Sequence, residues 1–66
     1  MEIVINGESR EVVQGYTVAQ LIADQGLAGR RLAVEVNREI VPRSSHAAHQ
    51  LQAGDHVEIV HAIGGG

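Results

Sequence analysis

The sequence predicts an α+β domain in which one sheet carries one main helix on a single face. Three observations support this class: an Asn-Gly dipeptide between two strand patterns, one short stretch of helical periodicity, and further strand patterns rich in β-branched residues. A hairpin followed by one helix and then more strands is typical of this arrangement. With 66 residues the chain has the length of one domain. We expect that domain to span residues 1–63, followed by a flexible tail at residues 64–66.

A hairpin is predicted at the N-terminal end. Residues 1–6 are rich in β-branched residues, and period-two alternation places Ile3 and Ile5 on one face. Asn6-Gly7 follows, and this dipeptide favours a type I′ turn because both central residues of that turn need positive φ. The return strand is expected over residues 8–13.

One short helix is predicted over residues 18–25. Thr17 and Gln20 have the spacing of a capping box. Apolar residues then recur at i, i+3 and i+4, which gives the helix one apolar face. Gly26 suits the left-handed position after the last turn, with Leu27 placed to close a Schellman contact. Because so short a helix is marginal on its own, we expect it to pack on the sheet.

Three more strands are predicted after the helix, over residues 32–37, 39–41 and 56–63. Pro42 ends the second of them and marks a sheet edge, because proline lacks the N–H that a central strand needs. Residues 44–50 are polar and have room for one helical or 3₁₀ turn. The last strand is apolar on both faces, which is typical of a central strand. The pattern alone leaves the pairing order of the strands open.

The composition excludes several classes of function. The chain has a formal net charge of −3, no cysteine and one aromatic residue. It therefore lacks the basic face and stacking side chains of a nucleic-acid binder and any thiolate site. No apolar run is long enough to span a membrane, and the N-terminus has no signal-peptide pattern. We expect a cytoplasmic protein that starts at its natural first residue and has no nucleic-acid or membrane partner.

No metal site and no active site are predicted. We expect the four histidines, His46, His49, His56 and His61, to be solvated, because zinc needs three or four converging ligands. Arg30-Arg31 is expected to be a solvated pair, since no glycine-rich phosphate loop precedes the helix. No serine has a recognisable base and orienting partner. The chain is therefore expected not to be an enzyme.

The last three residues, Gly64–Gly66, are the most informative feature. A frayed end is the plain interpretation. Three glycines directly after a strand pattern instead favour a thin extension without side chains that ends in the Gly66 carboxylate. The face of the last strand away from the helix would then be a docking surface for the partner that receives the tail. We expect this surface to consist of Val60, Ala62 and Ile63.

Two stretches of the sequence are specific enough to point to a family: VNREIVPR at residues 36–43 and GDHVEIVHAIGGG at residues 54–66. IVING at residues 3–7 and YTVAQLI at residues 16–22 agree with them. Over essentially its whole length the chain resembles the ThiS-type sulfur carriers of thiamin biosynthesis. The resemblance implies the ubiquitin-like β-grasp fold, with a mixed sheet of about five strands and one main helix packed on one face.

The resemblance also implies a role for the tail. A ThiF-type adenylyltransferase would use ATP and Mg²⁺ to adenylate the Gly66 carboxylate, and a cysteine-derived persulfide would displace AMP to leave a thiocarboxylate. Thiazole synthase would then take the sulfur. Gly64 and Gly65 would keep the tail narrow and mobile, and the chain itself would hold no bound cofactor.

Other functions share some of these features. A sulfur carrier of molybdopterin or cysteine biosynthesis, or a ubiquitin-like protein modifier, would have the same fold and the same Gly-Gly end. A non-covalent β-grasp binding module is a more distant alternative, and a small enzyme or metal protein is another. The identity of the bound partner, thiazole synthase or the large subunit of molybdopterin synthase, would separate the sibling carriers.

Overall fold

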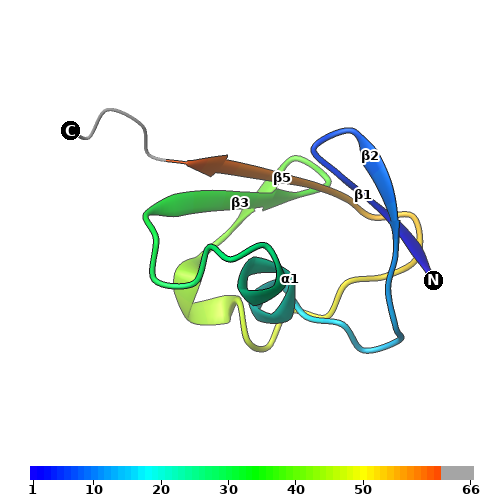
Figure 1. The fold of residues 1–66 in the computed structure, drawn as a ribbon, viewed down its shortest axis with the longest axis horizontal. Coiled ribbons are helices and arrows are strands. Elements are labelled where there is room, and N and C mark those ends of the chain that lie inside the picture. The colour runs from blue at the N-terminus through cyan, green and yellow to red at the C-terminus, as the bar shows by residue number, and fades with distance from the viewer. Residues whose placement is uncertain (62–66) are drawn as a thin grey trace.

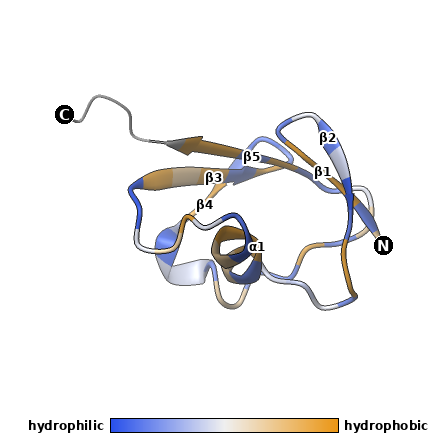
Figure 2. Cartoon of the chain, in the orientation of Figure 1, coloured by the Kyte–Doolittle hydropathy of each residue, from blue (hydrophilic) through white to orange (hydrophobic). Residues whose placement is uncertain are grey.

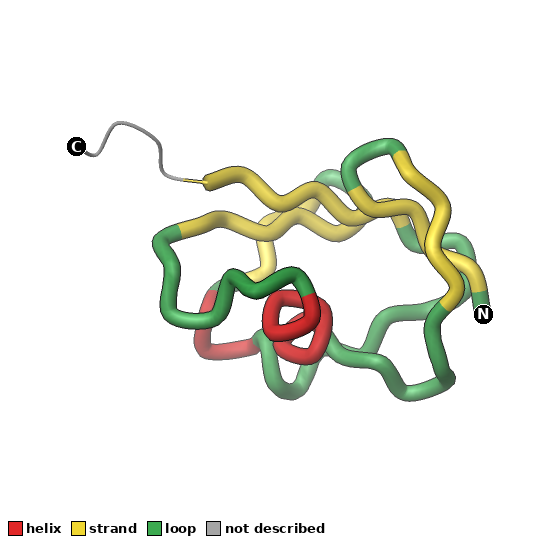
Figure 3. Tube along the Cα trace, in the orientation of Figure 1, coloured by secondary structure: helices red, strands yellow, loops and turns green. Residues whose placement is uncertain are grey.

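The computed structural model describes residues 1–61 and the side chains of residues 1–60. Within this range five strands form one mixed sheet in the order β2-β1-β5-β3-β4, and the helix lies against one of its faces (Figures 1 and 3). The predicted α+β class is therefore confirmed. The predicted domain end at residue 63 lies outside the described residues and stays a prediction. The elements are β1 (Glu2–Ile5), β2 (Glu8–Glu11), α1 (Val18–Asp24), β3 (Leu32–Val36), β4 (Glu39–Val41), the 3₁₀ turn η1 (Arg43–Ser45) and β5 (His56–His61).

The predicted hairpin is confirmed, and a second one has the same kind of turn. Asn6 and Gly7 have φ angles of 49° and 85°, as a type I′ turn requires. Asn37 and Arg38 join β3 to β4 with φ angles of 51° and 71°. The return strand β2 is shorter than predicted, because Glu11 already lies opposite the first residue of β1. The chain beyond Glu11 therefore runs past the end of its partner strand.

The helix begins where its capping box predicts and ends at Asp24, one residue earlier than predicted. The backbone N–H of Gln20 donates to Thr17 Oγ1 over 3.1 Å, and the backbone N–H of Thr17 donates to Gln20 Oε1 over 2.8 Å. At the other end Gly26 has a φ of 74°, and the Leu27 N–H donates to the Ile22 carbonyl over 3.0 Å, which completes a Schellman motif. These local bonds fix the length of a helix that is too short to be stable alone.

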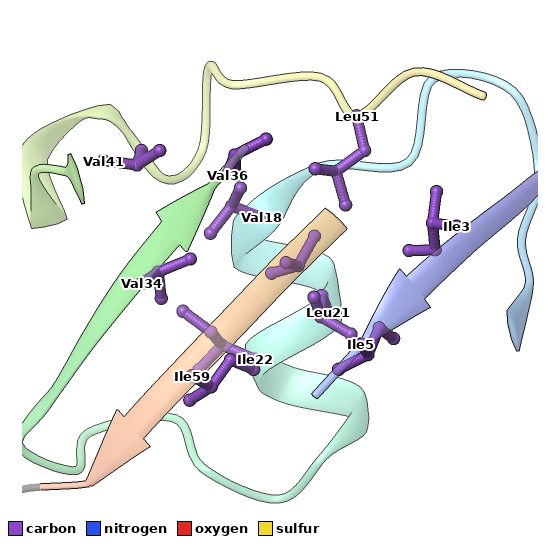
Figure 4. Packing of buried hydrophobic residues seen from close by; sticks show 11 residues of the cluster. Ile3, Ile5, Val18, Leu21, Ile22, Val34, Val36, Val41, Leu51 and Ile59 are labelled. Atoms are coloured by element: carbon purple, nitrogen blue, oxygen red, sulfur yellow. The ribbon is translucent and has the colours of Figure 1, made fainter. Parts of the chain in front are cut away.

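Strand β5 occupies the centre of the sheet, as its apolar composition predicts. It pairs in parallel with β1 and antiparallel with β3. Alternate residues of the strands face α1 and build one apolar core, which Figure 4 shows from close by. Leu21, 1% exposed, comes from the helix and packs at its middle. The buried apolar residues are Ile3, Ile5, Val18, Leu21, Ile22, Val34, Val36, Val41, Leu51, Val57 and Ile59.

The prediction that all four histidines are solvated is wrong for His46, which is 9% exposed. Its ring nitrogen Nε2 lies 3.0 Å from the Val41 carbonyl, and its backbone carbonyl accepts a hydrogen bond from the Ala19 N–H over 3.0 Å. The residue therefore joins the segment after η1 to both β4 and α1. The segment around His46 is polar, which made the residue look exposed. Its ring is buried because it forms a hydrogen bond with the carbonyl of Val41 at the end of β4.

Candidate functional site

The predicted site begins where the central strand ends. Strand β5 runs to His61, and Ala62, Ile63 and the three glycines follow directly in the sequence. Strand β1 pairs with β5 only at His56 and Val57, whereas β3 pairs with it as far as His61, so β3 holds the end of the strand from which the tail starts. The predicted site residues Ala62, Ile63, Gly64, Gly65 and Gly66 lie outside the described residues.

Two asparagines with left-handed backbone hold β5 in position. The N–H of Ile59 donates to Asn6 Oδ1 over 2.9 Å, and the N–H of His56 donates to Asn37 Oδ1 over 2.9 Å. Asn37 Nδ2 also donates to Asp55 Oδ1 over 3.0 Å. Both hairpin turns therefore serve a second purpose, because their asparagine side chains satisfy backbone donors of the central strand. Sequence reasoning assigned Asn6 to a turn and missed the contact of both asparagines with β5.

Val60 is the one predicted docking residue whose side chain the structure describes. It is 54% exposed and lies opposite Ala33 of β3, on the face of the sheet away from α1. The adjacent β5 residue Ile59 is buried against the helix. This is the exposure that the alternation predicts, and the role of Val60 in docking stays a prediction.

Three further side chains share this open face and were not predicted as part of the docking surface. Glu35 of β3 lies opposite Glu58 of β5 on one side and opposite Ile40 of β4 on the other. Ile40 is 62% exposed, although it is a large apolar residue. Residues directly opposite in neighbouring strands point to the same face, so these three form one row across the sheet. The row can be recognised only after the strand order is known.

Elsewhere, the polar side chains have structural roles. The Tyr16 hydroxyl donates a hydrogen bond to an Asp24 carboxylate oxygen, which ties the loop before α1 to the end of the helix. Burial, together with the hydrogen bond to Asp24 and the charge of that carboxylate, raises the pKa of Tyr16 to about 12. Arg43 donates over 3.4 Å to the carbonyl of Arg30, which ties the arginine loop to the start of η1.

Two kinds of feature were looked for in the described part of the chain, a group of metal-ligating side chains and a helix that could span a membrane. Among its residues, no three His, Asp or Glu side chains come together in a group that could hold a metal ion. No helix in the same range has both the length and the apolarity that crossing a bilayer requires.

The comparisons with known proteins agree with this arrangement. The model of the ThiS family matches residues 3–66, which is nearly the whole chain and includes the terminal glycines. The chain belongs to the ThiS family. The sulfur carrier protein ThiS of Escherichia coli is 38% identical over 68 aligned positions, with both chains covered in full.

Solved structures of the family confirm the fold. The crystal structure of the thiamine biosynthesis protein ThiS from Geobacter metallireducens superimposes with a TM-score of 0.84 at 29% identity, and both chains are covered in full. The solution structure of the same protein gives a TM-score of 0.80 and is covered over 88% of its length. The predicted β-grasp fold and the predicted resemblance to ThiS-type carriers are both confirmed.

Two further relatives are larger proteins. The thiazole synthase of Paramagnetospirillum magneticum is 48% identical over 66 residues, and that of Magnetococcus marinus is 41% identical over 66 residues. All of this chain is covered in each case, but it spans only 20% of either relative.

Proposed function

We propose that the chain carries sulfur for thiazole formation as a thiocarboxylate on Gly66. The observation that carries this proposal is that the family match extends through Gly66, five residues after the end of the sheet's central strand. A carrier needs a reactive end that is presented by a rigid body and is thin enough to enter a partner's active site. Gly64 and Gly65 supply the thin approach, because glycine has no Cβ.

The proposed chemistry takes place in partners and starts from a poor electrophile. The Gly66 carboxylate, ionised at neutral pH with an ordinary pKa of about 3.5, attacks the α-phosphorus of ATP. Pyrophosphate leaves and an acyl-adenylate forms, in the active site of a ThiF-type adenylyltransferase that uses Mg²⁺. The terminal sulfur of a cysteine-derived persulfide then attacks the acyl carbon and displaces AMP. A thiol cleaves the resulting acyl disulfide, and this leaves the thiocarboxylate on Gly66 and a new disulfide on the donor side.

Thiazole synthase is the proposed acceptor of the sulfur. Support comes from the two relatives that carry this name and contain a segment similar to the entire chain. Because that segment makes up 20% of each, carrier-like and other sequence are joined there in one polypeptide. Covalent joining of two segments gives each a high effective concentration around the other, which is useful for partners that meet in every catalytic cycle. We place these reactions in the cytoplasm, where ATP and the sulfur donor are available.

Intact mass spectrometry tests the proposal. The chain ending at Gly66 is incubated with a ThiF-type adenylyltransferase, ATP, Mg²⁺ and a persulfide donor. A gain of about 16 Da, the difference between sulfur and oxygen, is expected. Addition of thiazole synthase and its other substrates should return the mass to its starting value. Transfer to the large subunit of molybdopterin synthase, with none to thiazole synthase, would instead assign the chain to the sibling pathway.

A further inference from the structure

The turn between β1 and β2 contains a chemically reactive dipeptide. In Asn6-Gly7 the backbone nitrogen of Gly7 can attack the side-chain amide carbon of Asn6, because glycine has no side chain to hinder the approach. A C–N bond forms, the side-chain nitrogen leaves as ammonia with the proton from Gly7, and a succinimide ring joins the two residues. Water then opens the ring at either of its carbonyl groups and leaves aspartate or isoaspartate. Both residues are exposed, so water reaches them.

The backbone conformation of Asn6 keeps the two reacting atoms apart. Asn6 has a φ of 49°, and in this left-handed region the Cβ of a residue lies close to its own carbonyl oxygen. Because the peptide group is planar, the nitrogen of Gly7 lies on the opposite side of the carbonyl carbon from that oxygen. It therefore points away from the side chain that it would attack. The ring can close only after the backbone of Asn6 rotates out of the left-handed region, which breaks the type I′ turn.

Two hydrogen bonds to the central strand hold Asn6 in this conformation. Its backbone N–H donates to the Val57 carbonyl over 2.9 Å, and its Oδ1 accepts from the Ile59 N–H over 2.9 Å. Both partners are buried residues of β5, since Val57 is 1% exposed and Ile59 is 7% exposed. Rotation of Asn6 must break these bonds, so the conformation that protects the side chain is tied to the middle of the sheet.

The outer strand of the hairpin adds little to this protection. All four residues of β2 are exposed, and the strand is drawn mostly in hydrophilic colours in Figure 2. Strand β1, in contrast, buries Ile3 and Ile5 in the core. The turn is therefore held from the side of β1 and β5, and its conformation depends on the core that keeps these two strands together.

We propose that Asn6 is a latent modification site, at which the folded chain suppresses succinimide formation and unfolding releases it. The isoaspartate product makes the change one-way, because the main chain then runs through the former side chain and gains one atom. The length of the turn fixes the register that places Ile5 opposite Glu8, and an added atom is incompatible with it. Aspartate keeps the main chain unchanged and retains an oxygen that can accept from the Ile59 N–H.

The second hairpin provides an internal reference. Asn37 is the other asparagine of the chain, and it has a similar left-handed φ of 51°. Its Oδ1 likewise accepts from a β5 donor, the N–H of His56, over 2.9 Å. The residue that follows is Arg38, whose side chain hinders attack by its backbone nitrogen. In the unfolded chain Asn6 should therefore be modified much faster than Asn37.

The rate of deamidation in the folded and the unfolded chain tests the proposal. The chain is incubated in buffer and in urea at the same mildly alkaline pH, and a peptide of residues 3–9 in both solutions gives the rate without a fold. Each event adds about 1 Da, and peptide mapping locates it. An isoaspartyl methyltransferase counts the isoaspartate. Leu21→Ala is incubated in buffer as a chain with a weakened core, and Asn6→Asp reproduces the aspartate product.

We expect the chain in urea to react at Asn6 as fast as the peptide, and the folded chain at least about tenfold more slowly. Leu21→Ala should react faster than the folded parent, and Asn6→Asp should fold. Chain that carries isoaspartate should not regain the urea midpoint of the parent.

A folded chain that reacts as fast as the peptide would overturn the protection, and a Leu21→Ala rate equal to that of the parent would overturn release by unfolding. In urea, equal rates at Asn6 and Asn37 would overturn the site. An isoaspartate form with the midpoint of the parent, or an Asn6→Asp chain that does not fold, would overturn the distinction between the two products.

Discussion

Replacement of Arg38 by glycine should stabilise the chain, because it removes a left-handed residue that carries a Cβ. Arg38 has a φ of 71° and is the second residue of the two-residue turn between β3 and β4. A non-glycine residue pays roughly 1–2 kcal/mol in this region. Glycine costs roughly 0.5–1 kcal/mol of additional chain entropy on folding. The difference predicts that Arg38→Gly raises the free energy of unfolding by about 0.5–1 kcal/mol.

The first hairpin provides the matched control. Gly7 has a φ of 85° at the same position of an equivalent turn, and a Cβ built there would meet no atom within 4 Å. Gly7→Arg therefore introduces the backbone cost without a steric clash, and it should lower stability by a similar amount. Urea titrations followed by circular dichroism measure both changes as shifts in midpoint at unchanged slope. In thermal melts the gain for Arg38→Gly corresponds to about 2–8 °C for a domain of this size.

One outcome would refute the reasoning about the strained turn. If Arg38→Gly is less stable than the parent at low salt, attraction between the guanidinium and the carboxylates of Glu35 and Glu58 outweighs the backbone cost. Repeating the titration in 1 M salt, where the Debye length falls to about 3 Å, separates the two effects. A backbone effect persists at high salt, whereas an ionic one disappears.

Three more predictions address the core, the tyrosine and the open face. Leu21 is 1% exposed, so Leu21→Ala should lower the free energy of unfolding, measured by urea titration, by about 2–5 kcal/mol. A loss below about 1 kcal/mol would show that the core around Leu21 is loosely packed. An absorbance titration should give Tyr16 a pKa of about 12, and Asp24→Asn should lower it. The unfolded chain loses the hydroxyl proton of Tyr16 near its ordinary pKa of 10.0, whereas the folded chain keeps it to about pH 12. The stability that this difference in pKa contributes is therefore complete below pH 10 and is lost between pH 10 and 12. A free energy of unfolding that stays constant across that range would contradict the assignment. Val60→Ser should weaken binding of the adenylating enzyme several-fold. The control Val13→Ser alters a residue that is 68% exposed and lies outside the open face, and it should leave the affinity unchanged. Equal effects of the two substitutions would remove Val60 from the interface.

Local signals account for the parts of the fold that could be predicted from sequence. The Asn6-Gly7 turn and the capping box of α1 depend on residues a few positions apart, and both are observed. The central position of β5 could be inferred because it is rich in β-branched residues and carries apolar side chains on both faces, Val57 and Ile59 on one and Val60 on the other. The strand order could not be predicted, because the parallel pairing of Val4 with His56 joins residues from opposite ends of the chain without a local signal.

The candidate site was predictable only in part, for the same reason. Val60 could be placed on the open face by alternation along its own strand. Ile40, Glu35 and Glu58 come from three different strands, and they form one row only because β3 lies between β4 and β5. The burial of His46 likewise depends on a carbonyl at the end of another strand. Features built from distant strands need the fold before they can be recognised.

The most direct test of the central claim compares the chain ending at Gly66 with a variant that lacks this one residue. Both are incubated with the adenylating enzyme, ATP, Mg²⁺ and a persulfide donor, and intact masses are recorded. The chain ending at Gly66 should gain about 16 Da and the shortened variant should gain nothing, because its carboxylate no longer reaches the reacting phosphorus. A mass gain of the same size in the shortened variant, or none in the chain ending at Gly66, would contradict the assignment of Gly66 as the sulfur-bearing residue.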